Sequence, residues 1–288
     1  MNRQLTLILG IITVTVLTFS TGCRKFVDKN ILASSNNSVA TNVFDDVFKQ
    51  VDDAASSESD LNKTEEGTWT MNTSACATVT LDPLGTDFPK TLTLDFGSGC
   101  TGFDGVWRSG IITAVFTGRY REEGTEITVT LEDYHVGQYA VEGSKSITNG
   151  GLDANDNIFY NVNVNDVVIS WDDVQITWES SQVRTWTEGS ETNFFTPDGN
   201  GGILGLAGIT DDVYEITGIA NGTDRNGHPY TVQTTTPLVV QVGCRYIKSG
   251  ILVISPENYY DGTVDYGNGE CDNQATIEIN GQVYNFTM

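Results

Sequence analysis

The sequence predicts an all-β fold: an antiparallel meander forming a sandwich or a curled half-barrel, with one short N-terminal helix after a lipoprotein signal. From Gly67 onward, apolar and polar residues alternate, as in the run ITVTL at 127–131. This two-residue period is typical of strands with one face in water. Clusters of Gly, Asn and Asp separate the alternating runs, as in hairpin turns.

The composition excludes some classes of protein. The 288 residues carry 38 acidic side chains against 15 Lys and Arg, for a net charge of −23. This acidity argues against a nucleic-acid binder, which needs a basic surface, and against adhesion to an anionic membrane by charge alone. We assign the acids to turns and to the wet faces of strands. The length fits one large domain or two fused halves.

A secretory signal is predicted over residues 1–22. One cation, Arg3, precedes an apolar stretch from Leu5 to Phe19, which is too short to cross a bilayer. Ser20-Thr21-Gly22-Cys23 follows, and small residues leading into a cysteine resemble the lipobox of bacterial lipoproteins, although Ser20 stands where Leu is more usual. We therefore predict cleavage before Cys23 and lipidation of Cys23. The alternative is an ordinary secretory signal with an incidental cysteine.

The remaining cysteines predict disulfides. Cleavage after residue 22 leaves 266 residues with a charge of −24, and four cysteines besides Cys23. An even number of cysteines in an oxidising compartment indicates disulfides, although four allow three connectivities. The spacing favours local pairs, Cys76 with Cys100 and Cys244 with Cys271. The alternative is four buried thiols.

The N-terminal third is divided by composition. Residues 23–40 are polar and rich in Ser and Asn, which predicts a flexible tether. Thr41 is the expected N-cap of a helix over residues 42–55, which has an apolar stripe of Val and Phe. We expect it to seal one end of the β-core; the alternative is a lid or partner-binding helix. An acidic linker completes residues 41–66, and the β-domain is predicted over 67–288.

Two short patterns occur at both ends of the β-domain. Residues 93–100 (TLDFGSGC) are echoed by residues 263–271 (TVDYGNGEC). A basic residue followed by Ser-Gly-Ile also occurs twice, at 108–111 and 248–251. The order of the two patterns is reversed between the ends, so a simple duplication is not indicated. Each end is nevertheless predicted to carry the same strand, glycine turn and cysteine.

The chain resembles a family of hypothetical lipoproteins from the Bacteroidota. The resemblance is carried by these two turns, by the run GRYREEGTEITVTLEDYHVGQYAVEGSKSITN, by CRYIKSG and by the closing YGNGECDNQATIEINGQVYNF. It covers residues 41–288 and implies an outer-membrane location and a long antiparallel β-domain, with no activity or site. Surface-bound lipoproteins of these bacteria often carry acids after the cysteine, whereas Arg24-Lys25-Phe26 follows here. The periplasmic face is therefore favoured.

Catalytic and metal-binding patterns are sparse. His135 and His228 are the two imidazoles, and no Gly-x-Ser-x-Gly motif accompanies them. Adjacent acids on a strand point to opposite faces, which weakens an acid–base pair. We therefore predict no enzymatic activity and no required cofactor. Calcium is the candidate ion, at a turn with four oxygen-bearing residues; the alternative is a polar turn without an ion. These residues are Asp153, Asn155, Asp156 and Asn157.

Three tryptophans, Trp171, Trp178 and Trp186, are candidate ligand-binding residues. Exposed together, they would stack on sugar rings; buried, they would be core. The leading hypothesis is a membrane-anchored, non-enzymatic structural or binding domain without nucleic-acid partners. One alternative is a carrier with a lipid or other apolar ligand in a half-barrel cavity beneath the 42–55 helix. The other is a glycan-binding or glycan-active protein with at least two of these tryptophans exposed on one face.

Overall fold

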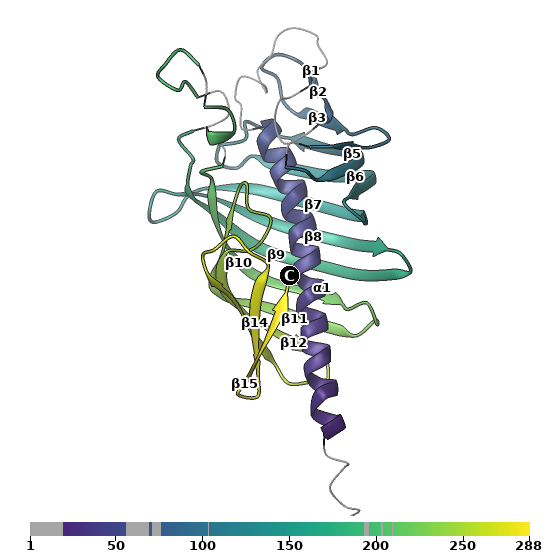
Figure 1. Cartoon of the computed structure of the whole chain (residues 1–288). Coiled ribbons are helices and arrows are strands. Elements are labelled where there is room, and N and C mark those ends of the chain that lie inside the picture. The colour runs from purple at the N-terminus through teal and green to yellow at the C-terminus, as the bar shows by residue number, and fades with distance from the viewer. Residues whose placement is uncertain are drawn as a thin grey trace, which may run out of the picture.

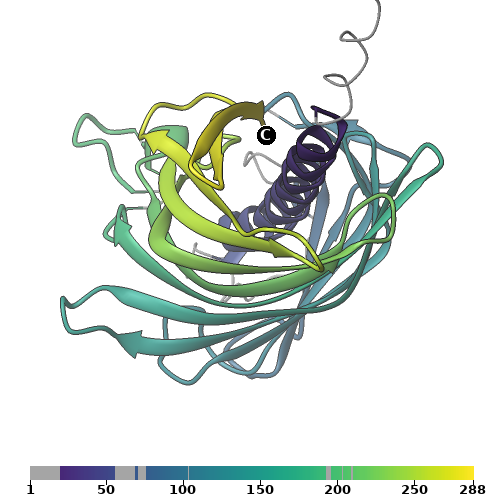
Figure 2. The ribbon, with the colours of Figure 1, turned by 90° about the horizontal axis from the view of Figure 1, so that it is seen from below.

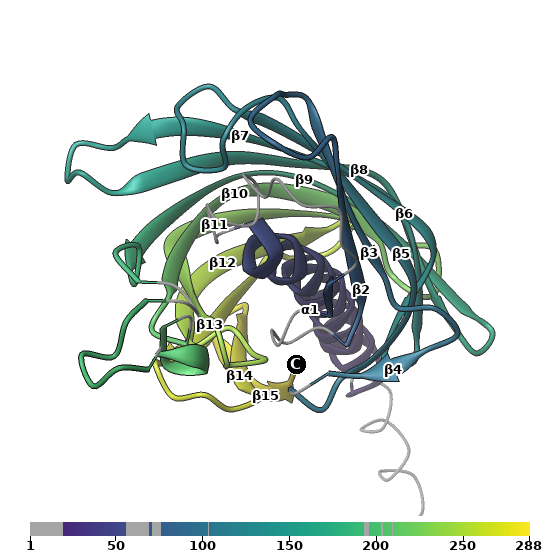
Figure 3. The same cartoon turned by 90° about the horizontal axis from the view of Figure 1, so that it is seen from above.

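One long helix, α1 (Ser20–Ala55), lies in the concave face of a strongly curled antiparallel sheet (Figure 1). The computed structural model describes residues 20–55, 69–70, 76–102, 104–192, 196–202, 204–208 and 210–288. The predicted all-β meander is confirmed. Of the two expected forms, the sheet takes the curled one: it wraps around α1 without folding into two layers (Figures 2 and 3).

The order of strands in the sheet follows the chain. In the described part, the path runs β1-β2-β3-β5 and then consecutively to β15, while β4 pairs with β5 outside this path. The strands are β1 (Trp69–Thr70), β2 (Thr78–Asp82), β3 (Lys90–Asp95), β4 (Cys100–Thr101), β5 (Trp107–Phe116), β6 (Glu126–Val136), β7 (Tyr139–Leu152), β8 (Ile158–Trp171), β9 (Val174–Glu188), β10 (Val213–Thr223), β11 (Pro229–Gln241), β12 (Ser249–Pro256), β13 (Gly262–Asn268), β14 (Gln274–Ile279) and β15 (Gln282–Thr287).

The curl follows from the residue pattern and from bulges. Along β9, Ile176, Trp178 and Trp186 are buried, while Thr177 and Glu179 between them are exposed. Every second residue therefore faces α1. Register shifts interrupt several pairs, including β5–β6, β7–β8, β8–β9 and β10–β11. Bulges increase the local twist, so their repetition bends the meander around the helix.

The helix is longer than predicted. It has 36 residues, which corresponds to about 54 Å. The predicted apolar stripe is confirmed, because Val43, Phe44, Val47, Phe48 and Val51 are all buried. The predicted start is wrong: the helix begins before Thr41, which lies in its interior instead of capping it. Among the described residues, no helix combines the length and apolarity needed to cross a membrane.

The predicted flexible tether is helical. Residues 24–40 belong to α1, and the side chains of Asn30, Ser34, Asn36, Asn37 and Ser38 are buried. Their composition disfavours an isolated helix, but most helical stability in proteins comes from tertiary packing. Here the sheet accepts the polar residues as partners. The predicted acidic linker at 56–66 lies outside the described residues.

The repeated patterns form one local structure twice. Asp95 pairs with Ile111 in β3–β5, and Asp265 pairs with Ile251 in β12–β13. Gly110 and Gly250 sit at the bulges with φ of +83° and +117°, where the neighbouring strand leaves no room for a side chain. In the first copy, the strand with the aspartate precedes the strand with the glycine along the chain, and in the second copy it follows it. The same pairing is thus built in the opposite chain order, which explains why the two patterns are reversed.

Each copy of this structure adjoins a disulfide. Cys76 is bonded to Cys100, and Cys244 is bonded to Cys271. Both predicted local pairs are thus confirmed. On a loop-entropy model, each bridge contributes about 3.5 kcal/mol.

A single proline substitution tests whether the Ser/Asn-rich segment is helical. Ser34 is 1% exposed, and Ser34→Pro should lower the free energy of unfolding by about 3 kcal/mol or more, because proline removes a helical hydrogen bond and clashes with the preceding turn. Ser34→Ala is the matched control and should be nearly neutral. Chemical denaturation of both variants is the measurement. Equal stabilities would contradict a helix at this position.

Candidate functional site

Buried polar contacts join α1 to the concave face of the sheet. A buried polar group costs free energy unless it is hydrogen-bonded, so these contacts fix where the helix lies. The contacts, in helix order, are Trp178 Nε1 to Asn37 Oδ1 (3.0 Å), Lys145 Nζ to the Phe44 carbonyl (3.0 Å), Arg184 to Asp45 Oδ1 (2.7 Å), Arg108 and Tyr134 to Asp46, Lys49 Nζ to the Cys244 carbonyl (3.1 Å) and Tyr214 Oη to Asp52 Oδ2 (3.0 Å).

The first ionic centre is the Asp46 carboxylate. Arg108 on β5 donates to both Asp46 oxygens, and its Nε lies 2.9 Å from Oδ2. Tyr134 Oη also donates to Oδ2 at 2.9 Å, and Asp104 binds the guanidinium from the other side. Burial alone would lower the pKa of Arg108, but the hydrogen bonds to Asp46 and Asp104 raise it above its ordinary value. Arg108 is therefore a permanent buried cation.

The second ionic centre lies one residue earlier on the helix. Arg184 on β9 donates to Asp45 Oδ1 at 2.7 Å. Its guanidinium also lies 4.1 Å from the ring centroid of Phe48 and 4.5 Å from that of Tyr214. A planar cation of this kind can bind a carboxylate and stack on aromatic rings at the same time. The pair locks α1 against the middle of the sheet.

Lys145 on β7 is the third buried cation. It is 3% exposed, and its Nζ donates to the carbonyl of Phe44 in the middle of α1. Burial lowers the pKa of Lys145 to about 7, and the neighbouring Arg184 acts in the same direction, against Asp45. Its ammonium is thus the one of these three cations that loses its proton near neutrality.

The C-terminal end of α1 enters an aromatic cluster. Tyr214 Oη donates to Asp52 Oδ2 at 3.0 Å, and Tyr214 stacks on Trp186 with 5.3 Å between ring centroids. Tyr120 stacks on Tyr160 at 5.5 Å. Burial raises the pKa of Asp52, while hydrogen bonding from Tyr120 and Tyr214 lowers it in part.

A cleft of about 490 Å³ runs beside α1 where the two ends of the curled sheet approach each other. Val39, Asp46 and Lys49 of α1 form its floor, with Tyr139 on one wall and Met288 on the other. Both Asp46 oxygens accept hydrogen bonds from Arg108 or Tyr134, so this carboxylate is already partnered within the protein. We call this space the seam cleft.

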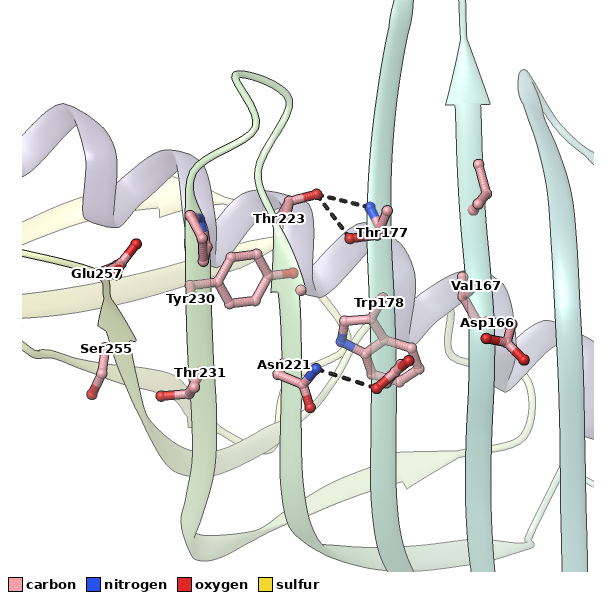
Figure 4. A pocket seen from close by; sticks show the side chains of 14 residues that line it. Asp166, Val167, Thr177, Trp178, Asn221, Thr223, Tyr230, Thr231, Ser255 and Glu257 are labelled. Atoms are coloured by element: carbon pink, nitrogen blue, oxygen red, sulfur yellow. Dashed lines mark hydrogen bonds between the residues drawn. The ribbon is translucent and has the colours of Figure 1, made fainter.

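A second hollow, of about 800 Å³, crosses strands β8 to β12. Figure 4 shows these strands in front of α1, with Thr177 hydrogen-bonded to Thr223 (2.9 Å) and Asn221 to Glu179 (3.4 Å). Its lining combines hydroxyl, amide and carboxylate side chains with the apolar Val167, Val168 and Pro229. The polar side chains can hydrogen-bond a polar ligand, but Trp178 and Tyr230, the aromatic residues of its lining, are only 2% exposed.

The three candidate tryptophans do not form a stacking surface. Trp178 and Trp186 are 2% and 1% exposed, because both lie on the inward face of β9. Trp178 packs on Phe44 of α1, and Trp186 on Tyr214. Trp171 is half-buried at the end of β8 against Tyr139. Trp178 and Trp186 are therefore core residues, the other of the two interpretations that the sequence offered, since the helix covers them.

The candidate calcium residues form a hairpin turn. Asp153 Oδ1 accepts the backbone N–H groups of Asn155 (2.8 Å) and Asn157 (2.9 Å), which lowers the pKa of Asp153. Asp198 accepts two backbone N–H groups in the same way. Within the described residues, no group of three or more His, Cys, Asp or Glu side chains is placed to hold a metal ion. The carboxylate of Asp153 thus has a structural partner in the turn itself.

Cys23 and the two histidines are the remaining residues that the sequence singled out. Cys23 lies in the first turns of α1, and lipidation of Cys23 stays a prediction. His135 lies in β6, where its Nδ1 contacts the Asp133 carbonyl. His228 lies in the turn between β10 and β11, where its Nδ1 contacts Asp224.

Cations at inward positions of alternating strands are a sequence signal for these buried centres. Lys145 shares its strand face with Ile147, and Arg184 shares its face with Trp178 and Trp186. A cation at an inward position of an alternating strand predicts a buried carboxylate partner, since an isolated buried charge is strongly disfavoured. For Arg184 this partner is Asp45 of α1, whereas Lys145 donates to the Phe44 carbonyl of the same helix.

These features define a class: an open, curled β-meander filled by its own N-terminal helix. Comparison with family models, with curated proteins and with solved structures finds no match to the chain.

Removal of one carboxylate tests the first ionic centre. Asp46→Ala should lower the free energy of unfolding by about 3 kcal/mol, because it leaves Arg108 and Tyr134 buried without their main acceptor. Asp104→Ala, at the more exposed partner of Arg108, should cost about 1 kcal/mol or less. Urea denaturation of the two variants provides the comparison. A larger loss at Asp104 than at Asp46 would contradict this assignment.

The pH dependence of stability tests Lys145. Its pKa is about 7 in the folded protein against 10.5 for the ordinary side chain, so the unfolded chain binds more protons between these values. The contribution of Lys145 to stability should therefore rise with pH, by up to about 1.4 kcal/mol per pH unit above pH 7. Lys145→Met should remove this increase. Unfolding of both proteins at pH 7 and pH 9 is compared, and parallel pH profiles would count against the prediction.

Proposed function

We propose that this chain is a lipoprotein anchored in the outer membrane through Cys23, with a non-enzymatic structural or binding β-domain on the periplasmic face. The observation that supports the proposal is the course of α1. The helix contains Cys23 near its start and ends among the buried aromatic residues of the sheet. The expected lipid anchor and the folded domain thus share one continuous helix.

This arrangement would fix the position of the domain relative to the lipid. The first buried side chain described after Cys23 is Asn30, seven residues away, which is about 10 Å along a helix. Several acyl chains bind a bilayer almost irreversibly. A lipid on Cys23 would therefore hold the domain close to the membrane, at a distance that a flexible tether would not fix.

The two alternatives require features that the described residues do not provide. A carrier requires a continuous apolar cavity beneath residues 42–55, but Phe44 and Phe48 pack there directly on Trp178, Tyr160 and Tyr214. A glycan platform requires two exposed tryptophans, and Trp178 and Trp186 are buried. The seam cleft is the site that we assign to a binding role, because its walls combine apolar side chains with paired charges.

Metabolic labelling with a clickable palmitate analogue tests the anchor. The wild-type chain should carry the label and sediment with membranes, because acylated Cys23 inserts into the bilayer. Cys23→Ala should lose the label and be recovered as soluble or unprocessed protein. Ser20→Leu, which restores the usual lipobox residue, serves as the control and should be labelled at least as well as wild type. Undiminished labelling of Cys23→Ala would overturn the proposal.

A further inference from the structure

Strand β15 is the last strand of the sheet, and one of its two edges is unpaired. Within the described residues, β15 pairs with β14 alone. The two strands are joined by Asn280 and Gly281, whose φ values of +51° and +77° are typical of a two-residue hairpin turn. Their register has no shift over the whole of β15, in contrast to the bulged pairs in the middle of the sheet. β15 is therefore a regular edge strand.

The hydrogen-bonding pattern identifies the backbone groups that point away from β14. The Met288 N–H donates to the Asn273 carbonyl at 3.0 Å. In an antiparallel pair, alternate residues bond the same neighbour, so the even-numbered residues of β15 face β14 and the odd-numbered residues face the open edge. These are Val283, which is 63% exposed, and the likewise exposed Asn285 and Thr287. Each offers one N–H donor and one carbonyl acceptor at this edge.

This edge lacks the features that usually prevent the addition of a strand. Natural edge strands are protected by charged side chains, prolines or bulges. Residues 282–287 (QVYNFT) contain no charge and no proline, and their pairing with β14 contains no bulge. The odd-numbered side chains lie on the outer face of the sheet, while Phe286 is buried on the inner face. A strand laid along β15 would therefore meet main-chain partners at alternate residues and no charged side chain of β15.

The charge of the neighbouring surface favours a basic partner. Residues 257–288 contain six acids and no Lys, Arg or His. Glu278 on β14 is exposed and pairs with Val283, so it lies on the outer face one strand from the open edge. Strands are about 4.8 Å apart, and exposed charges interact over about 10 Å at 0.1 M salt. Glu278 is therefore close enough to attract a cation on a strand added beside β15.

The same charge disfavours a second copy of the chain as the partner. Two copies paired through β15 would bring two acidic surfaces together, which is repulsive. Lys29 of α1 approaches this region, but it does so at Tyr259, in the loop before β13, with 4.3 Å between Nζ and the ring centroid. It is not placed on the outer face of β14 and β15.

We propose that the open edge of β15 is an interaction site for an extended, basic segment of another protein, which adds to the sheet as a further strand. The backbone groups of Val283, Asn285 and Thr287 supply the hydrogen bonds, and the acidic outer face supplies long-range attraction. Basic side chains of the added strand point outward, on the face of Glu278. Apolar side chains point inward, beside the half-buried Tyr284. This site does not depend on the lipidation of Cys23.

Peptide binding to the purified full-length protein tests the site. The probe is a fluorescently labelled peptide of eight residues that alternates lysine and valine. Its control contains the same residues in two blocks, four lysines followed by four valines. Fluorescence anisotropy measures the Kd of each peptide. The alternating peptide should bind at least about tenfold more tightly, because an extended strand then carries lysines on one face and valines on the other. Its affinity should fall as the salt concentration is raised.

Asn285→Pro is the matching change in the protein, and Asn285→Ala is its control. The Asn285 N–H faces the open edge, so proline removes a donor there and no hydrogen bond between β14 and β15. Asn285→Pro should weaken binding of the alternating peptide by at least about tenfold, and Asn285→Ala by less than about twofold. Thermal unfolding establishes that each variant is folded.

Hydrogen exchange of the wild-type protein provides a second measurement that needs no variant. Saturation with the alternating peptide should slow exchange at the amides of Val283, Asn285 and Thr287. Unchanged exchange at these amides, equal binding of the two peptides, or equal binding to wild type and folded Asn285→Pro overturns the proposal. A dimeric mass with the three amides already protected before peptide is added also overturns it, because a second copy then occupies the edge.

Discussion

The structure depends on the hydrogen bonds and ion pairs that the sheet must supply to the buried polar side chains of α1. Three acids of α1 face the sheet: Asp45 and Asp46 are met by arginines of β9 and β5, and Asp52 by Tyr214 of β10. In the described part, β1 and β15 are the ends of an open path, so closure does not set the curl of the sheet. The bulges bend the sheet, and we infer that α1 fixes the extent of the curl, because strands as distant as β5 and β13 contact the same helix.

Polar contacts also give this interface a unique register. A helix with an apolar stripe alone could rotate or slide along a concave apolar surface at little cost. Here a shift by one residue would separate Asp46 from Arg108 and Asp45 from Arg184 at the same time. Buried ion pairs often add little net stability compared with apolar packing, but breaking one is costly. In this protein the ion pairs hold α1 in a single position, and that position also determines where the seam cleft lies.

The strands were predictable from the sequence because alternation and turn residues are local signals. The disulfide pairs followed from spacing, and the apolar stripe of residues 42–55 followed from its period. The first half of α1 was not predictable in this way, since Asn36, Asn37 and Ser38 are hydrogen-bonded to residues more than a hundred positions away, namely Arg225, Trp178 and Tyr266. The same long-range packing buries Trp178 and Trp186, so their residue type alone could not distinguish core from surface.

The meander topology has a consequence for the order of synthesis. Strand pairs form between neighbours in the chain, so each hairpin can fold as it appears. The helix is made first, yet its partners extend from Arg108 to Tyr266, near the end of the sequence. The helix must therefore wait until almost the whole chain has emerged. The serines and asparagines of its first half leave that part of the segment polar while the strands of the sheet are still being made.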